Sequence, residues 1–183
     1  MIIFENVHTT PRRRLFKLLG VEWTATPYAW LSVPLYFVVG VVLACIIDSH
    51  QSIEARLLIG LAYSLMLHLS NALHSIGHTL SGRWVGAPMD ENLITATFHV
   101  TLYRDDPARY SRWVHIGRSL GGPVANLLVG AAALGVWQLA DVGGLAFFAV
   151  MNLATGVYTL LPIPSIDGGV IWSELLGRRS RLS

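Results

Sequence analysis

Charged residues and cysteine are both scarce in this sequence. Only 13% of the 183 residues are charged, whereas a water-soluble domain usually carries about 25%. Together with 53% hydrophobic residues and a mean hydropathy of +0.52, this deficit indicates a membrane protein, with residues 1–183 as a single domain. The one cysteine, Cys45, excludes an intrachain disulfide. The net charge of +2, with basic residues in short clusters, argues against nucleic-acid binding.

Four apolar stretches are long enough to cross a bilayer, which takes about 20 residues each. They cover approximately residues 28–47, 55–79, 114–140 and 143–161. We therefore predict an all-α membrane protein with four transmembrane helices. The polar stretch between the second and third helices has room for a short β strand or hairpin.

The basic residues predict the orientation of these helices. Of the thirteen Lys and Arg residues, four precede the first span, five lie between Arg83 and Arg118, and three follow the fourth span. Because cytoplasmic segments carry the excess of basic residues, we expect both termini and the middle loop to be cytoplasmic. The membrane would be an inner or plasma membrane.

Within the middle loop, residues 94–103 alternate between apolar and polar side chains. A period of two is typical of a half-buried strand, so we predict a strand from Ile94 to Tyr103. Its backbone edge must be covered or must accept an extended peptide as a further strand. The alternative is a hairpin that only caps the helices.

The second predicted helix carries His74 and His78 near its cytoplasmic end. Residues four apart share one helix face, so both imidazoles can bind the same metal ion. The fourth helix runs in the same direction and leads to Asp167, which returns to the same membrane face. Two imidazoles, one carboxylate and an open fourth position are typical of a catalytic type of zinc site.

Three stretches of the sequence resemble the site-2-protease family of intramembrane zinc metalloproteases. Residues 74–86, which begin His-Ser-Ile-Gly-His, resemble the family's His-Glu-x-x-His helix and the glycine that follows it. Residues 121–126, Gly-Gly-Pro-Val-Ala-Asn, resemble its Gly-Pro-x-x-Asn motif. Residues 152–169, which end Ser-Ile-Asp-Gly-Gly, resemble its closing Asp-Gly motif. The order and spacing also match, and only the first helix and the N-terminal tail lack a motif.

This resemblance implies specific roles for several residues. It implies that His74, His78 and Asp167 bind Zn²⁺, that Asn126 borders the active site, and that the strand at 94–103 lies near the site, where family members dock an unwound substrate. It does not imply catalysis, because the family's glutamate falls on Ser75. The chain is thus identified as a minimal member of the family that lacks the catalytic glutamate.

The loss of that glutamate has a large kinetic cost. General acid–base catalysis contributes roughly 10²–10⁴-fold in rate, and a serine hydroxyl is no base near neutral pH without a base of its own. Glu91, His99 or Glu174 are candidate substitutes, although the sequence does not place any of them at the site. A zinc ion without a base leaves room for residual hydrolysis.

Two other polar residues of the second helix have alternative interpretations. Asn71 shares a face with His74 and His78, so it could orient a ligand imidazole or form an interhelical hydrogen bond. His68 points elsewhere and is either a satisfied interior histidine or a ligand for a pigment or haem.

Three functional hypotheses follow. The first is an inactive relative of the protease that keeps zinc as a structural link and serves as a subunit of a larger membrane complex, or holds a transmembrane client. The second is an active intramembrane zinc endopeptidase with a relocated base. The third is a membrane subunit in which His68, His74 or His78 ligates haem or chlorophyll.

Overall fold

The structure, a computed structural model, describes residues 9–104, 106–140 and 142–177. Two β strands precede the first long helix, two more follow the second, and a short helix ends the described chain. In sequence order the elements are β1 (Arg13–Leu18), β2 (Val21–Ala25), the 3-10 turn η1 (Ala29–Leu31), α1 (Ser32–Ile47), α2 (Ile53–Trp84), β3 (Glu91–Ile94), β4 (His99–Leu102), the 3-10 turn η2 (Pro107–Arg109), α3 (Arg112–Ala140), α4 (Gly143–Thr159) and α5 (Asp167–Leu175).

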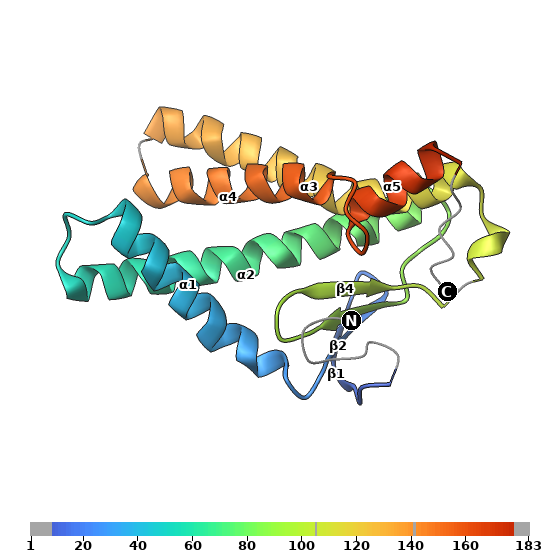
Figure 1. Cartoon of the computed structure of the whole chain (residues 1–183), viewed down its shortest axis with the longest axis horizontal. Helices are drawn as coiled ribbons and strands as arrows, with labels where there is room; N and C mark the ends of the chain where they lie inside the picture. The colour runs from blue at the N-terminus through green and yellow to red at the C-terminus, as the bar shows by residue number, and fades with distance from the viewer. Residues whose placement is uncertain (1–8, 105, 141, 178–183) are drawn as a thin grey trace.

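Helix α2 lies at the centre of the molecule. Helices α3 and α4 pack along one side of it, while α1 and the sheet lie on the other (Figure 1). The short helix α5 packs against α3 near the end of α2 that carries the histidines. This arrangement brings the C-terminal Asp-Gly segment and the end of α2 together.

Three of the four predicted spans are confirmed as helices long and apolar enough to cross a membrane. They are Ala29–Ile47, Ile53–Trp84 and Arg112–Ala140. The fourth, α4, has only 17 residues, so a count of four membrane helices is not confirmed. Helix α2 has 32 residues and is therefore roughly 48 Å long, longer than the roughly 30 Å hydrocarbon layer.

The predicted strand at 94–103 is wrong in its extent. Strand β3 ends at Ile94 and β4 begins at His99, and residues 95–98 form the turn between them, where the Thr95 hydroxyl hydrogen-bonds to the carbonyl of Phe98 over 2.7 Å. The segment is therefore a hairpin, but β3 also pairs with β2, so the hairpin is part of a sheet rather than only a cap on the helices. Within this turn only Thr95 is both buried and hydrogen-bonded through its hydroxyl.

The predicted helical class is confirmed only in part, because the N-terminal segment adds two strands to the hairpin between α2 and α3. The sheet has the order β1-β2-β3-β4, with antiparallel pairs at both sides and a parallel β2–β3 pair in the middle. The parallel pair joins segments separated by α1 and α2, so its partner could not be found by local pattern. The protein is mostly helical with a small mixed sheet.

A buried polar layer joins α2, α3 and α4 one turn before His74. Ser70 donates a hydrogen bond to the Oδ1 atom of Asn152 over 3.0 Å, and Asn126 donates to Ser70 over 3.3 Å. Both asparagines are fully buried. Because buried amides are costly without partners, this layer fixes how the three helices are aligned along their axes.

Candidate metal centre

His74, His78 and Asp167 converge at one point. The Nε2 atoms of the two imidazoles lie 3.1 Å apart. One carboxylate oxygen of Asp167 lies 3.1 Å from Nε2 of His74, and the other lies 3.2 Å from Nε2 of His78. All three candidate ligand atoms lie within 4.8 Å of one another. The structure thus brings together the three residues that the resemblance assigned to zinc.

The spacing of these donors fits a tetrahedral ion. Ligands at about 2.0–2.1 Å from Zn²⁺ are separated by roughly 3.3 Å along the edge of a tetrahedron, close to the separations observed here. His78 is buried, whereas the side chains of His74 and Asp167 each keep 18% exposure. The site is therefore closed to solvent on the side of His78 and partly open on the side of His74 and Asp167. A zinc site with three protein ligands has such an open position.

Asp167 is aimed at the histidines by the tight turn before α5. Gly168 packs so closely on the backbone of Leu160 and Leu161 that any side chain would collide with their carbonyl groups. Burial alone would raise the pKa of the Asp167 carboxyl. Attraction by His78 and hydrogen bonds with both imidazoles outweigh burial and lower this pKa to about 2. The carboxylate is therefore ionised, which is the form that binds a cation.

His78 is oriented from behind by α3. Its Nδ1 atom donates a 2.8 Å hydrogen bond to the carbonyl of Arg118, which leaves Nε2 free for a metal. The Arg118 guanidinium is buried between the rings of Tyr103 and Tyr110, 4.1 and 4.4 Å from their centroids, and it donates to the carbonyl of Ala87. This positioning contact was not predicted, because a backbone carbonyl leaves no mark in the sequence.

Gly122 on α3 completes the pocket around the imidazoles. A Cβ atom at this position would collide with the Nε2 atoms of both His74 and His78. The glycine therefore leaves open the space between the donors. This glycine lies within the 121–126 motif, which was the only sequence signal for it.

Ser75 faces the sheet rather than the metal residues. Its hydroxyl lies 3.1 Å from Nδ1 of His99 and donates a 3.1 Å hydrogen bond to the carbonyl of Asn71. His99 is thus the one of the three candidate substitute bases that the structure places beside Ser75.

In the part of the chain that the structure describes, the other two candidate bases make no hydrogen bond or ion pair with the candidate metal ligands. Glu91 is buried in β3, where it accepts hydrogen bonds from Arg12 over 2.7 Å and from Thr24 over 2.5 Å. Within the described residues, Glu174 makes no hydrogen bond or ion pair with any residue of the metal centre. Glu91 is thus already engaged by Arg12 and Thr24, and none of the described contacts places Glu174 at the metal centre.

Asn71 and Asn126 are bound to residues other than the candidate ligands. Asn71 donates over 2.8 Å to the hydroxyl of Tyr36 on α1, which matches the interhelical alternative rather than a role in orienting an imidazole. Asn126 belongs to the buried polar layer with Ser70. Both residues lie close to the metal centre along the helices but support the scaffold.

His68 has no room for a large ligand. Its ring lies 4.5 Å from that of Tyr36, and the cavity that it borders has a volume of about 10 Å³. Such a cavity is near the lower limit for a single water molecule. A haem or chlorophyll ring therefore does not fit in this cavity.

Comparisons with known proteins agree with this geometry, although no family model matches the chain. A zinc metalloprotease of Methanocaldococcus jannaschii is 22% identical over 171 residues, covering 91% of this chain and 46% of that protein. The solved structure of a site-2 protease from Methanocaldococcus jannaschii is similar with a TM-score of 0.65 and 22% identity, covering 93% of this chain and 74% of that chain. The chain is related to the site-2 proteases.

The resemblance drawn from the three motifs is thereby confirmed. The shared fold places the end of α2 and the start of α5 together, as the motif order requires. This chain spans about half the length of the curated relative, 46%. The curated relative is a zinc metalloprotease by name, whereas this chain carries Ser75 where the family motif has glutamate.

Proposed function

We propose that this chain is a zinc-binding membrane protein with the site-2-protease fold that has lost glutamate-dependent peptide hydrolysis. Zinc would link α2 to α5 through His74, His78 and Asp167. The role would be binding, as a subunit of a membrane complex or as a holder of a transmembrane client. Both termini would face the cytoplasm, in an inner or plasma membrane.

One observation carries this proposal: the donor set is intact while the position of the base is filled by a hydrogen-bonded Ser75–His99 pair. When bound, zinc supplies Lewis acidity, but hydrolysis also needs a group that takes and returns a proton. Burial lowers the pKa of His99 to about 4. A base works best with a pKa near the working pH, so His99 is a poor substitute for the glutamate.

The retained metal would have a structural effect. Helix α5 has only nine residues, and its first residue, Asp167, is the one that faces α2. A ligand that binds only the folded state stabilises it by about 2.7 kcal/mol when its concentration is a hundred times the dissociation constant. Zinc would therefore hold α5 against the bundle.

Metal analysis of the purified full chain tests the first part of the proposal. We expect about one zinc per chain, lost in His78→Asn and Asp167→Asn variants. His50→Asn and Glu54→Gln are matched controls, because His50 is exposed and Glu54 is fully exposed. If the native protein and the control variants all fold but contain no zinc, the proposed metal binding is contradicted.

Cleavage of a co-reconstituted transmembrane reporter tests the second part. The native chain should leave the reporter intact with or without zinc. If it cleaves the reporter and a chelator stops the cleavage, the inactive interpretation is wrong and a relocated base must exist. Co-purification of a membrane partner in mild detergent would then distinguish a complex subunit from a solitary protein.

A further inference from the structure

Strand β1 is an exposed edge of the sheet with both apolar and basic side chains. All six of its residues are exposed, and it pairs along one edge only, with β2, among the described residues. Large apolar side chains remain in solvent, including Leu15 at 47% and Phe16 at 49% exposure. Neighbouring exposed apolar side chains of this kind often mark an interaction surface.

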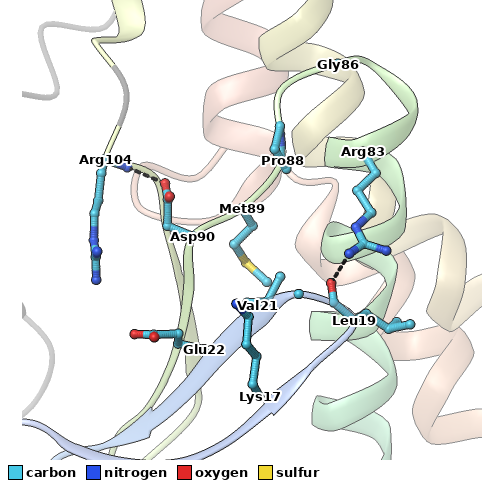
Figure 2. Close-up of a pocket in the computed structure, with 11 residues that line it drawn as sticks. Lys17, Leu19, Val21, Glu22, Arg83, Gly86, Pro88, Met89, Asp90 and Arg104 are labelled. Carbon is cyan, nitrogen blue, oxygen red and sulfur yellow. Dashed lines mark hydrogen bonds between the residues drawn. The ribbon is translucent and has the colours of Figure 1, made fainter.

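Basic side chains follow the same strand and continue into a neighbouring cleft. Arg13, Arg14 and Lys17 belong to β1. Lys17 also lines a cleft of about 530 Å³ together with Arg83 and Arg104 (Figure 2). Two carboxylates, those of Glu22 and Asp90, lie in this cleft as well.

Arg83 fixes the tip of the β1–β2 hairpin to the end of α2. Its guanidinium donates to the carbonyl of Leu19 in the hairpin turn (Figure 2). Gly20, in a left-handed conformation with φ of 72°, leaves room for the guanidinium, which a Cβ atom there would meet. The hairpin therefore has a defined position relative to the membrane helix that carries the metal residues.

Exposed aromatic side chains lie just before α1 and at the end of α2. Strand β2 ends at Ala25, and Tyr28 and Trp30 follow at 48% and 64% exposure, just before α1 begins. Trp84 is the last residue of α2 and is 92% exposed. Aromatic residues at helix ends are typical of the headgroup region, which is therefore the depth expected for the segment between β2 and α1.

We propose that β1 and the adjoining basic cleft dock onto an anionic lipid surface, the cytoplasmic leaflet of the membrane in which the helices lie. Apolar side chains enter the boundary between headgroups and acyl chains, and the cations of the strand and cleft bind lipid phosphates. The mixture of apolar and basic residues lies next to the exposed Tyr28 and Trp30. This combination favours lipid over a soluble acidic protein as the partner. The inference goes beyond the proposed zinc-binding role and does not depend on it.

Site-specific labelling of the full chain in nanodiscs tests this docking. In a Cys45→Ser background, Leu18→Cys is labelled with an environment-sensitive fluorophore. Gln51→Cys, in the exposed loop at the opposite end of α2, is the matched control. The nanodiscs contain phosphatidylcholine alone or phosphatidylcholine with phosphatidylglycerol.

We expect the label at position 18, but not at position 51, to shift to blue emission and to be quenched by spin-labelled lipid when phosphatidylglycerol is present. Each basic residue near an anionic surface contributes about 1 kcal/mol, or about fivefold in partitioning. The triple variant Arg13→Gln/Arg14→Gln/Lys17→Gln should therefore lose the shift that phosphatidylglycerol causes. High salt should remove it from the labelled protein without any charge variant.

Water-like emission at position 18 in both nanodiscs would overturn the proposal. A shift that appears only when soluble polyglutamate is added would also overturn it, in favour of an acidic protein partner. Zinc content, measured on the same samples, reports separately on the metal centre. A failure of docking with zinc retained, or the reverse, therefore separates the two proposals.

Discussion

The hydroxyl oxygen of Ser75 and the Nδ1 atom of His99 lie 3.1 Å apart. This contact joins α2 to β4 beside the candidate metal centre. A glutamate at position 75 would extend by two further carbon atoms, so its carboxylate would reach about 2.5 Å farther than the serine hydroxyl. The imidazole of His99 occupies this direction, and the small serine and the large histidine fill the space jointly.

Ser75→Glu alone should therefore destabilise the protein rather than restore an active centre. Forcing a larger side chain into an occupied site costs typically about 1–3 kcal/mol. Adding His99→Gly should relieve the crowding and recover most of the lost stability. Thermal unfolding in detergent measures both effects, with the exposed residue variant Ser49→Glu as the control.

The reporter assay extends this comparison to chemistry. Only the double variant Ser75→Glu/His99→Gly has both a carboxylate and the space for it, so only it should gain zinc-dependent cleavage. If the single variant Ser75→Glu is stable and cleaves the reporter, His99 does not block the space that a glutamate needs.

His99 also predicts how stability depends on pH. Burial lowers the pKa of His99 to about 4, and the neighbouring imidazoles of His68 and His74 add to this effect. In an unfolded chain the histidine pKa is about 6.5. Because the unfolded chain takes up a proton at a higher pH than the folded protein, the free energy of unfolding is highest above about pH 6.5. It falls by on the order of 3 kcal/mol as the pH drops towards 4.

The His99→Asn variant removes this titration. In chelator-treated protein, its unfolding temperature should fall less than that of the native sequence between pH 6.5 and 4. Comparing slopes rather than absolute values cancels the packing that is lost with the ring. Parallel slopes for the two proteins would show that His99 is protonated as easily in the folded state as in the unfolded state.

The sequence predicted the metal centre better than the sheet for a physical reason. His74 and His78 are linked by helical periodicity, and helix direction brings Asp167 to the same end of the bundle. The histidine spacing and the helix directions can each be determined from short stretches of sequence and the expected number of membrane crossings. The parallel pair of β2 and β3 joins segments on either side of two helices, and no pattern within β2 identifies its partner.

The contacts around the candidate ligands also could not be predicted from the sequence. The carbonyl of Arg118 orients His78, yet every residue has a carbonyl. His99 approaches Ser75 only because the β3–β4 hairpin turns at residues 95–98. A continuous strand through these residues, as the alternation suggested, would have placed His99 elsewhere.

Gly122 offers a test of the metal centre that leaves every candidate ligand in place. Gly122→Ala should weaken zinc binding, because its Cβ atom would collide with the Nε2 atoms of His74 and His78. Changes next to metal ligands typically cost about 10–100-fold in affinity, and we expect a loss in this range. Competition with a coloured chelator measures the dissociation constant.

Gly135→Ala is the matched control on the same helix. No atom lies within 4 Å of the position where its Cβ would be. Since alanine favours helix over glycine by roughly 1 kcal/mol, this variant should bind zinc normally and unfold at the same or a higher temperature. Equal zinc affinity in the two variants would mean that the imidazoles do not bind metal in the observed positions.

Glu91 tests how the N-terminal hairpin is held to the rest of the protein. Its side chain, only 3% exposed, pairs with Arg12 at 2.7 Å and with Arg104 at 3.5 Å. Glu91→Gln keeps an acceptor for Thr24 but removes the charge that both arginines face. Hydrogen bonds to charged groups contribute about 1.5–3 kcal/mol, so we expect a loss in this range, reduced by the partial exposure of Arg12.

The loss should be local before it is global, because Arg12 immediately precedes β1 and Glu91 begins β3. Weakening this ion pair would free the first hairpin while the membrane helices stay folded. Limited trypsin digestion should then cut faster after Arg14 and Lys17 in Glu91→Gln than in the native chain. Glu54→Gln, at a fully exposed carboxylate, should leave the digestion rate unchanged. Equal digestion of all three proteins would show that the Glu91 ion pairs are not needed to hold the hairpin in place.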